Sequence, residues 1–354
     1  MEQQNDALEL LDLIHVPAFC VKDGMITKVN PAAAACMIET GNPVAPLLHT
    51  GAQEYVEFSD GCLYLTLTVS GQQMGASVNR VKGMDVFMLE EETENARLQA
   101  MALAAKELRR PLSGVMATAD QLLPAMAQDD STQLQASCLS RGLYQLLRII
   151  GNMSDAGTAA AAQLEIRDIS ALLDEIFRKA EDLTAHTGVK LQYSGCPQRV
   201  FTLTDERKLE RMIWNILSNA IKFTPAGNYV SASVRCRSNR LYLSISDSGS
   251  GIADNLRGSM FTRYTRQPGI EDSRYGLGLG MVLIRNTAAL HGGTVLVDQK
   301  DGGTRITVSF AIRQGEAALQ SPQLRVDYAG ERDHGLVELS DVLPAYLYNP
   351  KENN

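Results

Sequence analysis

Three short groups of residues in the second half of the chain combine types and spacings that could take part in binding chemistry. The first lies in the stretch 205–223, where Asn215, Asn219 and Lys222 recur at helical spacing and therefore share one side of a helix. Polar groups on one stripe of an otherwise apolar helix need partners. Alone, such a stripe is more often a solvated helix edge than a binding site.

The second and third groups are rich in glycine. A strand that ends at Asp247 places a carboxylate at the edge of a sheet, and Gly249 and Gly251 let the backbone turn closely around a ligand. In the run 275–280, glycines open a helix, and the free N–H groups of a helix start suit phosphate oxygens. Each motif is weak by itself, because turns and helix starts of this composition also occur without ligands.

Taken together in chain order, these motifs resemble the N, G1, F and G2 boxes of the GHKL ATPases, and specifically those of sensor histidine kinases. The resemblance extends through the aromatic segment 260–266 and through His291-Gly292-Gly293, and it covers roughly residues 8–313. It implies ATP and Mg²⁺ as cofactors. It also implies a mobile lid between Phe261 and Gly276.

The resemblance assigns a role to each matching residue. Asn219 would ligate Mg²⁺ through its side-chain oxygen, a ligand type that this hard cation prefers. Asn215 and Lys222 would assist near the phosphates. Asp247 would accept a hydrogen bond from the adenine amino group, and Arg266 would steady the terminal phosphate by its charge. The glycines would shape the pocket: Gly249, Gly251, Gly276, Gly278 and Gly280.

The stretch 106–112, Lys-Glu-Leu-Arg-Arg-Pro-Leu, resembles the kinase segment that begins with the phosphate-accepting histidine. Lys106 occupies the acceptor position, and an exposed lysine ammonium has no lone pair to offer at neutral pH. Arg110 stands where the family uses Thr or Asn to orient water for removing phosphate from a response regulator. Glu107, the candidate catalytic base beside the acceptor, is retained. The five histidines lie elsewhere in the chain and are expected to be structural.

The elements around these residues follow from periodicity. Apolar residues recur in steps of three and four over 98–122 and again over 136–153, which predicts two antiparallel helices joined by a polar turn. One hairpin cannot bury such a seam alone. The pattern therefore predicts a homodimer with a four-helix bundle, or alternatively packing of the seam on a neighbouring domain. Lys106 follows the seam residue Ala105 and should be exposed.

The chain is therefore predicted to be an α+β multidomain protein. Residues 1–90 are expected to form a small domain that resembles PAS sensor domains over 16–33, with Asn30 capping a helix and Pro31 at its first position. Three further units are expected: a HisKA-like dimerisation hairpin at 91–158, an α/β-sandwich ATP-binding domain at 164–313, and a tail at 314–354. The apolar residues of the tail predict packing on its own catalytic domain or, alternatively, a partner-binding peptide.

Composition excludes several classes of function. The 33 basic and 41 acidic residues include no run of Lys and Arg, so nucleic acid is not an expected partner. No stretch reaches the roughly 18 to 20 apolar residues of a membrane span, and residues 1–12 are acidic where a signal peptide is basic, so a cytoplasmic protein is expected. The six cysteines are scattered without a CxxC pair, which predicts buried, reduced thiols.

Three hypotheses about function remain open at this point. The protein could phosphorylate a histidine on a partner kinase, for example in a heterodimer. It could be a pseudokinase, a nucleotide-binding scaffold in which a signal from the PAS-like domain changes what the hairpin binds, with a response regulator as one possible partner. It could also be a Ser/Thr-type kinase or an ATPase of the same superfamily. In each case the replacement of the acceptor histidine by Lys106 argues against ordinary autophosphorylation.

Overall fold

The first part of the structure is a five-stranded antiparallel sheet with two short helices. The computed structural model describes residues 11, 14–81, 83–90, 92–157, 163–252, 261, 278–313 and 332–350. The strands follow the order β2-β1-β5-β4-β3, with bounds β1 Ala18–Lys22, β2 Met25–Val29, β3 Cys62–Val69, β4 Gln72–Val81 and β5 Met84–Leu89. The helices are α2 Pro31–Ala35, α3 Ala52–Glu57 and the 3-10 turn Ala45–Leu47.

The predicted cap of α2 is confirmed. The Asn30 side chain accepts a hydrogen bond from the Ala33 N–H at 2.8 Å, and Pro31 occupies the first helical position. Asn30 is also buried, and its amide nitrogen donates to the carbonyls of Ile14 and Val16, both at 2.8 Å. One side chain therefore ties the start of α2 to the segment that leads into β1.

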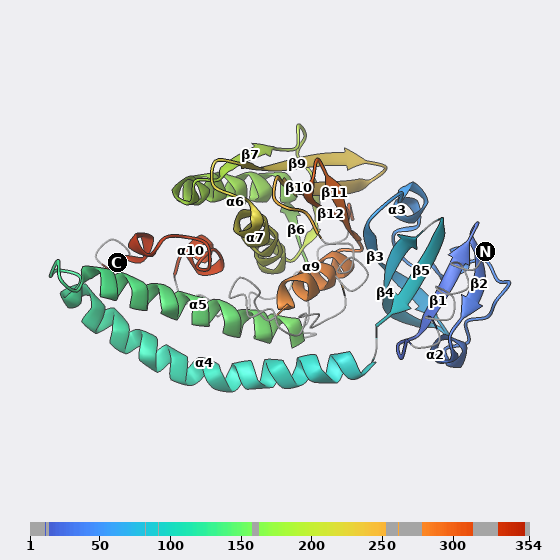
Figure 1. Cartoon of the computed structure of the whole chain (residues 1–354), viewed down its shortest axis with the longest axis horizontal. Coiled ribbons are helices and arrows are strands. Elements are labelled where there is room, and N and C mark those ends of the chain that lie inside the picture. Colours follow the sequence, from blue (N-terminus) through green and yellow to red (C-terminus); the bar gives the residue numbers. More distant parts are fainter. Residues whose placement is uncertain are drawn as a thin grey trace.

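The two predicted long helices are present as α4 Glu92–Met126 and α5 Gln133–Gly157, packed side by side as a hairpin. Figure 1 shows that α4 is curved. Pro111 and Pro124 lie inside it, and each removes one helical hydrogen bond, which accounts for a bend.

The apolar seam of the hairpin is divided between two faces, whereas the sequence predicted one continuous seam. Half of the predicted positions, among them Ala105, Leu112 and Ile150, are buried between the helices. Met101 and Met153 are half-buried. Five more of the predicted positions remain between 47 and 60% exposed: Leu108, Val115, Leu122, Leu139 and Leu146. Residues spaced by seven stay on one face of a helix, so the three side chains on α4 form one exposed apolar row and the two on α5 form another. We call them the exposed stripe.

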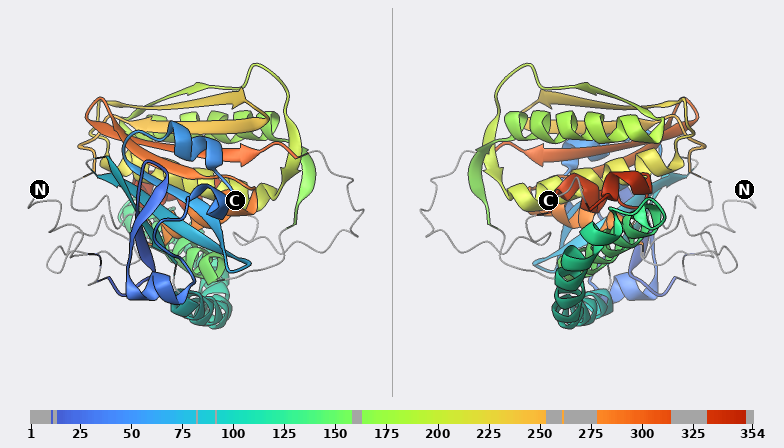
Figure 2. Two further views of the ribbon diagram at one scale, coloured as in Figure 1. Left: turned by 90° about the vertical axis from the view of Figure 1, so that its right-hand side faces the viewer. Right: turned by 90° about the vertical axis from the view of Figure 1, so that its left-hand side faces the viewer.

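The second half of the chain forms a sheet covered by helices on one face. Its strands are β7 Lys190–Ser194, β9 Tyr229–Arg237, β10 Arg240–Asp247, β11 Val295–Lys300 and β12 Gly303–Ala311, and a small separate sheet pairs β6 Glu165–Asp168 with β8 Phe201–Thr204. The helices are α6 Ile169–Thr184, followed by the 3-10 turn Ala185–Thr187, α7 Glu206–Phe223 and α9 Leu279–Leu290. These bounds confirm the helix expected over 205–223, the strand expected to end at Asp247 and the helix expected to follow the glycines of 275–280. Figure 2 shows the helices as a layer between the sheet and the α4–α5 hairpin.

The two sheets are continuous. Among the described residues, ten strands form one sheet in the order β2-β1-β5-β4-β3-β11-β12-β10-β9-β7. The joint is the antiparallel pairing of β3 with β11, in which Cys62, Leu63 and Tyr64 lie opposite Val297, Leu296 and Val295. Three ion pairs reinforce the contact between the halves: Arg240 with Glu54, Arg237 with Glu57 and Arg285 with Glu90. The first segment is therefore docked on the second by backbone hydrogen bonds and by charge.

The described end of the chain, residues 332–350, packs against both the hairpin and the second half. It contains α10 His334–Glu338 and the 3-10 turn Ala345–Tyr348, and we call it the C-terminal clasp. Val337, Leu339 and Tyr348 are fully buried in it. Figures 1 and 2 show it between α5 and the helical layer. Of the two alternatives for the tail, packing on its own chain is therefore observed for these residues, and the hairpin is part of the surface it covers.

The cysteines are only partly as expected. All six are free thiols, and Cys20 and Cys62 are buried, but Cys138 and Cys236 are exposed. Burial raises the pKa of the Cys62 thiol to about 12. The Sγ atoms of Cys196 and Cys236 lie 3.5 Å apart, although 40 residues separate them in the sequence. Within the described part of the chain, no helix is long and apolar enough to cross a membrane.

Candidate nucleotide-binding site

Helix α7 positions the asparagines of the first predicted motif. Asp205 caps it, its side chain accepting from the Lys208 N–H at 3.1 Å, and the apolar face of the helix is buried against the sheet. Asn215 is also buried and donates its amide hydrogen to the Arg211 carbonyl at 2.9 Å. This bond fixes the amide plane of Asn215 and leaves its oxygen directed at the start of α9. Asn219 and Lys222 are half-buried, one and two turns farther along α7.

The start of α9 lies against these amides. A Cβ atom added to Gly280 would lie 3.4 Å from Oδ1 of Asn215 and 3.7 Å from Nδ2 of Asn219. Gly278 caps α9 with φ +70°, a left-handed conformation that favours glycine. The N–H groups of the first turn have no helical partners and carry the positive end of the helix dipole, so an anion is stabilised there. The first and third predicted motifs are therefore adjacent in space.

Asp247 ends β10 beside the C-terminal end of α7. Its Oδ1 accepts from the Gly249 N–H at 2.9 Å and from the Thr304 N–H at 3.2 Å. Burial raises the pKa of this carboxyl above its ordinary value, and the two backbone donors oppose that rise. A Cβ atom at Gly249 would collide with the Phe223 carbonyl of α7. The strand end can therefore approach α7 this closely only because residue 249 is a glycine.

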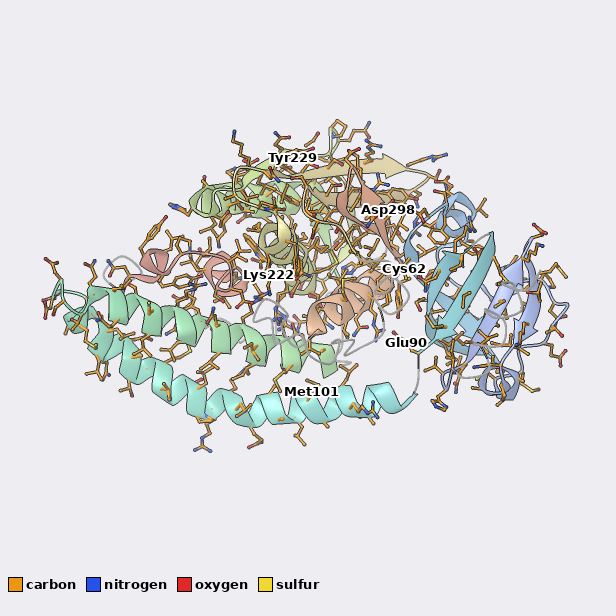
Figure 3. The ribbon with its side chains drawn as sticks, viewed as in Figure 1. Cys62, Glu90, Met101, Lys222, Tyr229 and Asp298 are labelled. Atoms are coloured by element: carbon orange, nitrogen blue, oxygen red, sulfur yellow. The ribbon has the colours of Figure 1, made fainter. Side chains whose placement is uncertain are left out.

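The structure thus places seven of the predicted cofactor-binding residues on or against the C-terminal half of α7. They come from α7, from the end of β10 and from the start of α9: Asn215, Asn219, Lys222, Asp247, Gly249, Gly278 and Gly280. Gly251 follows with φ +70°, where a Cβ atom would lie 2.7 Å from the Gly302 carbonyl. Arg266, Gly276 and the predicted lid, apart from Phe261, lie outside the described residues. Figure 3 labels Lys222 at the end of α7.

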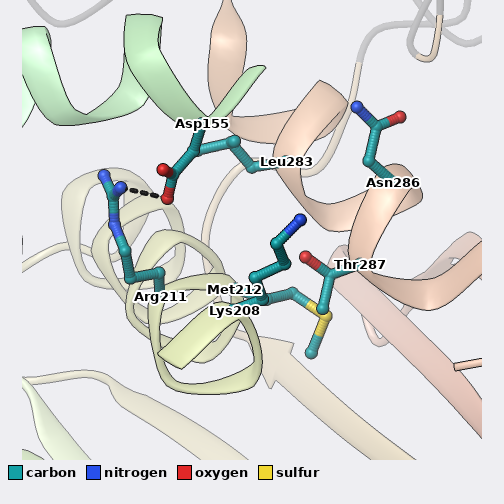
Figure 4. Close-up of a pocket in the computed structure, with 7 residues that line it drawn as sticks. All are labelled: Asp155, Lys208, Arg211, Met212, Leu283, Asn286 and Thr287. Atoms are coloured by element: carbon teal, nitrogen blue, oxygen red, sulfur yellow. Dashed lines mark hydrogen bonds and ion pairs between the residues drawn. The ribbon is translucent and has the colours of Figure 1, made fainter. Parts of the chain in front are cut away.

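A small cavity lies elsewhere, between α5, α7 and α9. Figure 4 shows its lining, which includes the ion pair of Asp155 with Arg211 and the side chains of Lys208 and Asn286. Its volume is about 40 Å³, enough for water but not for a nucleotide. On α7 it is lined by residues of the N-terminal half of the helix, away from Asn219, and no sequence motif indicated it. It is not the predicted site.

The residues of the predicted acceptor segment lie on α4. Lys106, Glu107 and Arg110 are all exposed, as the sequence predicted for Lys106. Their side chains are open to solvent and to any partner of the hairpin.

A buried charge cluster lies between the hairpin, α7 and the C-terminal clasp, and no sequence motif indicated it. Nε of Arg211, on α7, lies 3.0 Å from Oε1 of Glu338, and both side chains are at most 2% exposed. Arg211 also pairs with Asp155 and donates to Asn152 at 2.6 Å, both on α5. Arg148, also on α5, pairs with Glu338 at 3.5 Å. The 127 residues between Arg211 and Glu338 leave no local pattern that could have linked them.

Comparison with known families agrees with this geometry. Residues 204–314 match the family described as histidine kinase-, DNA gyrase B- and HSP90-like ATPases, and this range contains α7, Asp247 and α9. The second half of the chain therefore carries an ATPase domain of this class.

Curated relatives extend the similarity beyond that domain. A sensor-like histidine kinase of Rhizobium meliloti is 30% identical over 287 residues, which are 72% of this chain and 52% of the relative. Histidine kinase P4 of Formosa agariphila is 25% identical over 72% of this chain and 19% of its own length. The chain thus spans about half or less of these relatives. The similarity to the sensor histidine kinase family, proposed from the motifs, is confirmed.

Solved structures of histidine kinases also match. Full-length ShkA in complex with AMPPNP covers 61% of this chain and 46% of its own, at 24% identity and a TM-score of 0.48. The histidine kinase ThkA in complex with the response regulator TrrA covers 85% of this chain and 96% of its own, at 13% identity and a TM-score of 0.44.

Proposed function

We propose that the protein is a cytoplasmic signal-transduction protein of the sensor histidine kinase type, which binds Mg·ATP in the site between α7, β10 and α9 and does not phosphorylate its own hairpin. The observation that carries the proposal is the convergence of Asn215, Asn219 and Gly280 at the start of α9. Amide oxygens and a helix N-terminus are complementary to a cation and to the phosphates that it bridges.

The residues present fit the nucleotide. Asn219 would supply the protein oxygen for Mg²⁺, with Asn215 and Lys222 near the phosphates, and Asp247 would accept from the adenine amino group. Gly249 supports this fit, because a side chain there would meet the Phe223 carbonyl at the end of α7, the helix that carries the two asparagines. The role of Gly251 remains part of the proposal. The assigned roles of Arg266 and Gly276 remain part of the proposal. When bound, Mg·ATP supplies the phosphoryl group, and the residues of the chain bind and orient it.

The hairpin provides the chemical reason for excluding ordinary autophosphorylation. At the acceptor position the exposed Lys106 presents an ammonium, which is not a nucleophile at neutral pH, where the family presents an imidazole. Arg110 replaces the residue type that orients water for dephosphorylation. A role for Glu107 as a base is retained only if a partner supplies the acceptor.

We further propose that the exposed stripe pairs with a second hairpin, either from another copy of this chain or from a partner kinase. Three apolar side chains on α4 and two on α5, each about half exposed, support this, because monomers seldom leave large apolar surfaces in water. A partner kinase would supply a histidine for phosphorylation in trans. A response regulator is a further proposed partner. The five-stranded sheet of the first segment supports the proposal that it is a PAS-type input domain.

A second candidate function is that of an ATP-binding pseudokinase scaffold. The observation that favours it is the C-terminal clasp. Glu338 joins Arg148 of the hairpin to Arg211 of the ATPase domain through buried ion pairs, so that the ATPase domain is fixed on α5. A catalytic domain held in this way is poorly placed to reach an acceptor on another chain.

One experiment tests the pocket and separates these candidates. The full chain is incubated with Mg²⁺ and γ-labelled ATP, and acid-labile label is measured for wild type, Lys106→His, Asn219→Ala and the double variant. Wild type is expected to stay unlabelled and Lys106→His to be labelled, with the label lost when Asn219→Ala is added. Transfer by wild type to an added partner kinase would favour the trans kinase. Failure of wild type to bind ATP in a direct titration would overturn the proposed function.

A further inference from the structure

Arg285 connects the first segment of the chain with the ATPase domain. It lies on α9, less than two turns after the glycines that start this helix, and its side chain is 3% exposed. Its Nη1 lies 2.9 Å from Oε1 of Glu90 and donates to the Phe261 carbonyl at 2.6 Å. Its Cζ lies 5.5 Å from the centroid of the Tyr64 ring, within the range of a cation–π contact. A single buried cation therefore touches three residues from three parts of the chain.

The partners of Arg285 also contact one another. The Tyr64 hydroxyl donates to Oε1 of Glu90 at 2.7 Å, and the rings of Tyr64 and Phe261 lie 5.5 Å apart. Tyr64 and Phe261 are both almost completely buried. We call Tyr64, Glu90, Phe261 and Arg285 the Arg285 junction. Because interiors are closely packed, one member of such a cluster cannot shift without the others.

Strand β4 of the first segment packs directly against this cluster. A Cβ atom at Gly75, on β4, would collide with the Tyr64 hydroxyl and lie 2.6 Å from Cδ of Glu90. Tyr64 is on β3 at the joint of the two sheets, and Glu90 is placed between β5 and α4, as Figure 3 shows. A rearrangement that reaches β3, β4 or the end of β5 therefore reaches the guanidinium of Arg285.

The other side of the junction leads to the candidate nucleotide site. Arg285 and Gly280 are on the same short helix, and Gly280 lies next to Asn215 and Asn219. A helix moves as a stiff unit over such a distance, so a shift of Arg285 displaces the N–H groups at the start of α9. Phe261 belongs to the stretch between the two glycine motifs, and Arg285 holds its carbonyl.

We propose that the Arg285 junction couples the first segment directly to the nucleotide site, with Arg285 as a positioning residue that sets where the start of α9 and Phe261 lie. This inference rests on the proposed function, namely that the site binds Mg·ATP. A rearrangement of the first segment is passed from β3 and Glu90 to α9 through side-chain contacts. It does not need to travel along α4 and back through the hairpin.

The experiment measures the affinity of the full chain for a fluorescent ATP analogue with Mg²⁺. Gly75→Ala and Glu90→Gln change only the first segment, yet each is expected to weaken binding about five- to tenfold, the usual size of a coupling between sites. Arg285→Lys is expected to weaken it similarly, and Glu90→Gln combined with Arg285→Lys to be no weaker than the stronger single change. This non-additivity identifies one shared contact.

The matched control is Tyr55→Phe. It removes the hydrogen bond from Tyr55 to Asp85 at 2.7 Å, in the core of the same segment but outside the junction. It is expected to lower the melting temperature and to leave the affinity within twofold of wild type. Affinity losses that follow the melting temperature in all variants, or unchanged affinity in Gly75→Ala and Glu90→Gln, would overturn the junction while leaving the proposed function in place. Absence of binding by wild type would overturn both.

Discussion

His291 is a residue whose chemistry is set by where it is buried. It is 3% exposed, its Nε2 accepts from the Asp205 N–H at 3.1 Å, and its Nδ1 lies 2.8 Å from the Thr287 carbonyl. The accepting Nε2 must be unprotonated, so the ring is neutral with its proton on Nδ1. It links the cap of α7 to the end of α9, the two helices of the candidate site. The expectation of a structural role fits this geometry.

The pH dependence of stability follows from this burial. Burial lowers the pKa of His291 below its ordinary value of 6.5. The unfolded chain then binds more protons than the folded one as pH falls below about 6.5, so the free energy of unfolding decreases in that range, by at most about 1.4 kcal/mol per pH unit. We expect the urea midpoint of wild type to fall between pH 7 and pH 5.

A variant comparison isolates this contribution. His291→Gln removes the titrating ring and is expected to be less stable at pH 7 by about 1 kcal/mol, with a shallower fall towards pH 5. His49→Gln is the control, since His49 is exposed on the first segment. The His49→Gln variant should keep the steep fall in the urea midpoint that we expect for wild type between pH 7 and pH 5. If the urea midpoints of wild type and His291→Gln fell in parallel as pH is lowered, His291 would not be the source of the pH dependence.

Residue-scale features were predictable where the signal is local. Asn30 with Pro31, or Gly278 at a helix start, can be recognised because a cap involves neighbours within three positions. Arg285 and Glu338 could not be recognised as buried, because a charged residue is expected at the surface unless its partner is known. Their partners, Glu90 and Arg211, lie far away in the chain.

At the scale of elements, the hairpin shows both the strength and the limit of periodicity. Steps of three and four located α4 and α5, because a helix must direct its apolar residues to one side. The same steps did not show that Leu112 packs inside the hairpin while Leu108 and Val115 remain outside. Which face meets which neighbour depends on how two helices are placed together, and that is a tertiary property.

The exposed stripe predicts the oligomeric state. Replacing Leu108, Val115 and Leu122 by Asp places three charges on the face that we propose to be paired, and burying an unpaired charge is strongly unfavourable. We expect wild type to sediment as a dimer and the triple variant as a folded monomer. The measurement is analytical ultracentrifugation at micromolar concentration.

Leu103→Asp provides the matched control for this prediction. Leu103 is on the same helix and 63% exposed, but it lies off the stripe, since five residues turn a helix well away from the face of Leu108. It should remain dimeric. Wild type that sediments as a monomer would contradict pairing of the stripe between two copies of this chain.

At the scale of the whole molecule, the C-terminal clasp is expected to contribute much of the stability. Deleting residues 332–354 removes the buried Val337, Leu339 and Tyr348 and leaves Arg148 without its carboxylate partners Glu338 and Asp341. Losing one partner of a buried ion pair alone destabilises by about 3–5 kcal/mol. We expect a clear fall in melting temperature, measured by differential scanning calorimetry.

Two comparisons make this prediction specific. A synthetic peptide of residues 332–350, added in excess, is expected to restore part of the lost stability, because the contacts of the clasp lie within that segment. Lys179→Ala breaks the half-exposed pair of Lys179 with Asp333 and should change stability by less than about 1 kcal/mol. Equal effects of the deletion and of Lys179→Ala would show that the buried cluster contributes little.

The arrangement of the whole molecule was the least predictable from sequence. The strands on either side of the joint were recognisable, but nothing in the sequence indicated that β3 would pair with β11. The pairing involves three residues on each strand, and no turn connects them. Register at such a joint is set by the packing of complete sheets and not by local pattern.

The pairing of β3 with β11 also has a consequence for the synthesis of the protein on the ribosome. A ribosome makes Cys62 to Tyr64 long before Val295 to Val297, so the first sheet has time to fold while its future neighbour does not yet exist. At about 5–20 residues per second the interval is roughly ten to fifty seconds. Throughout it, β3 is an open edge with unpaired N–H and C=O groups, able to join a strand of another nascent chain. Nascent chains on the same messenger RNA would therefore be the first to compete with β11 for this edge of β3.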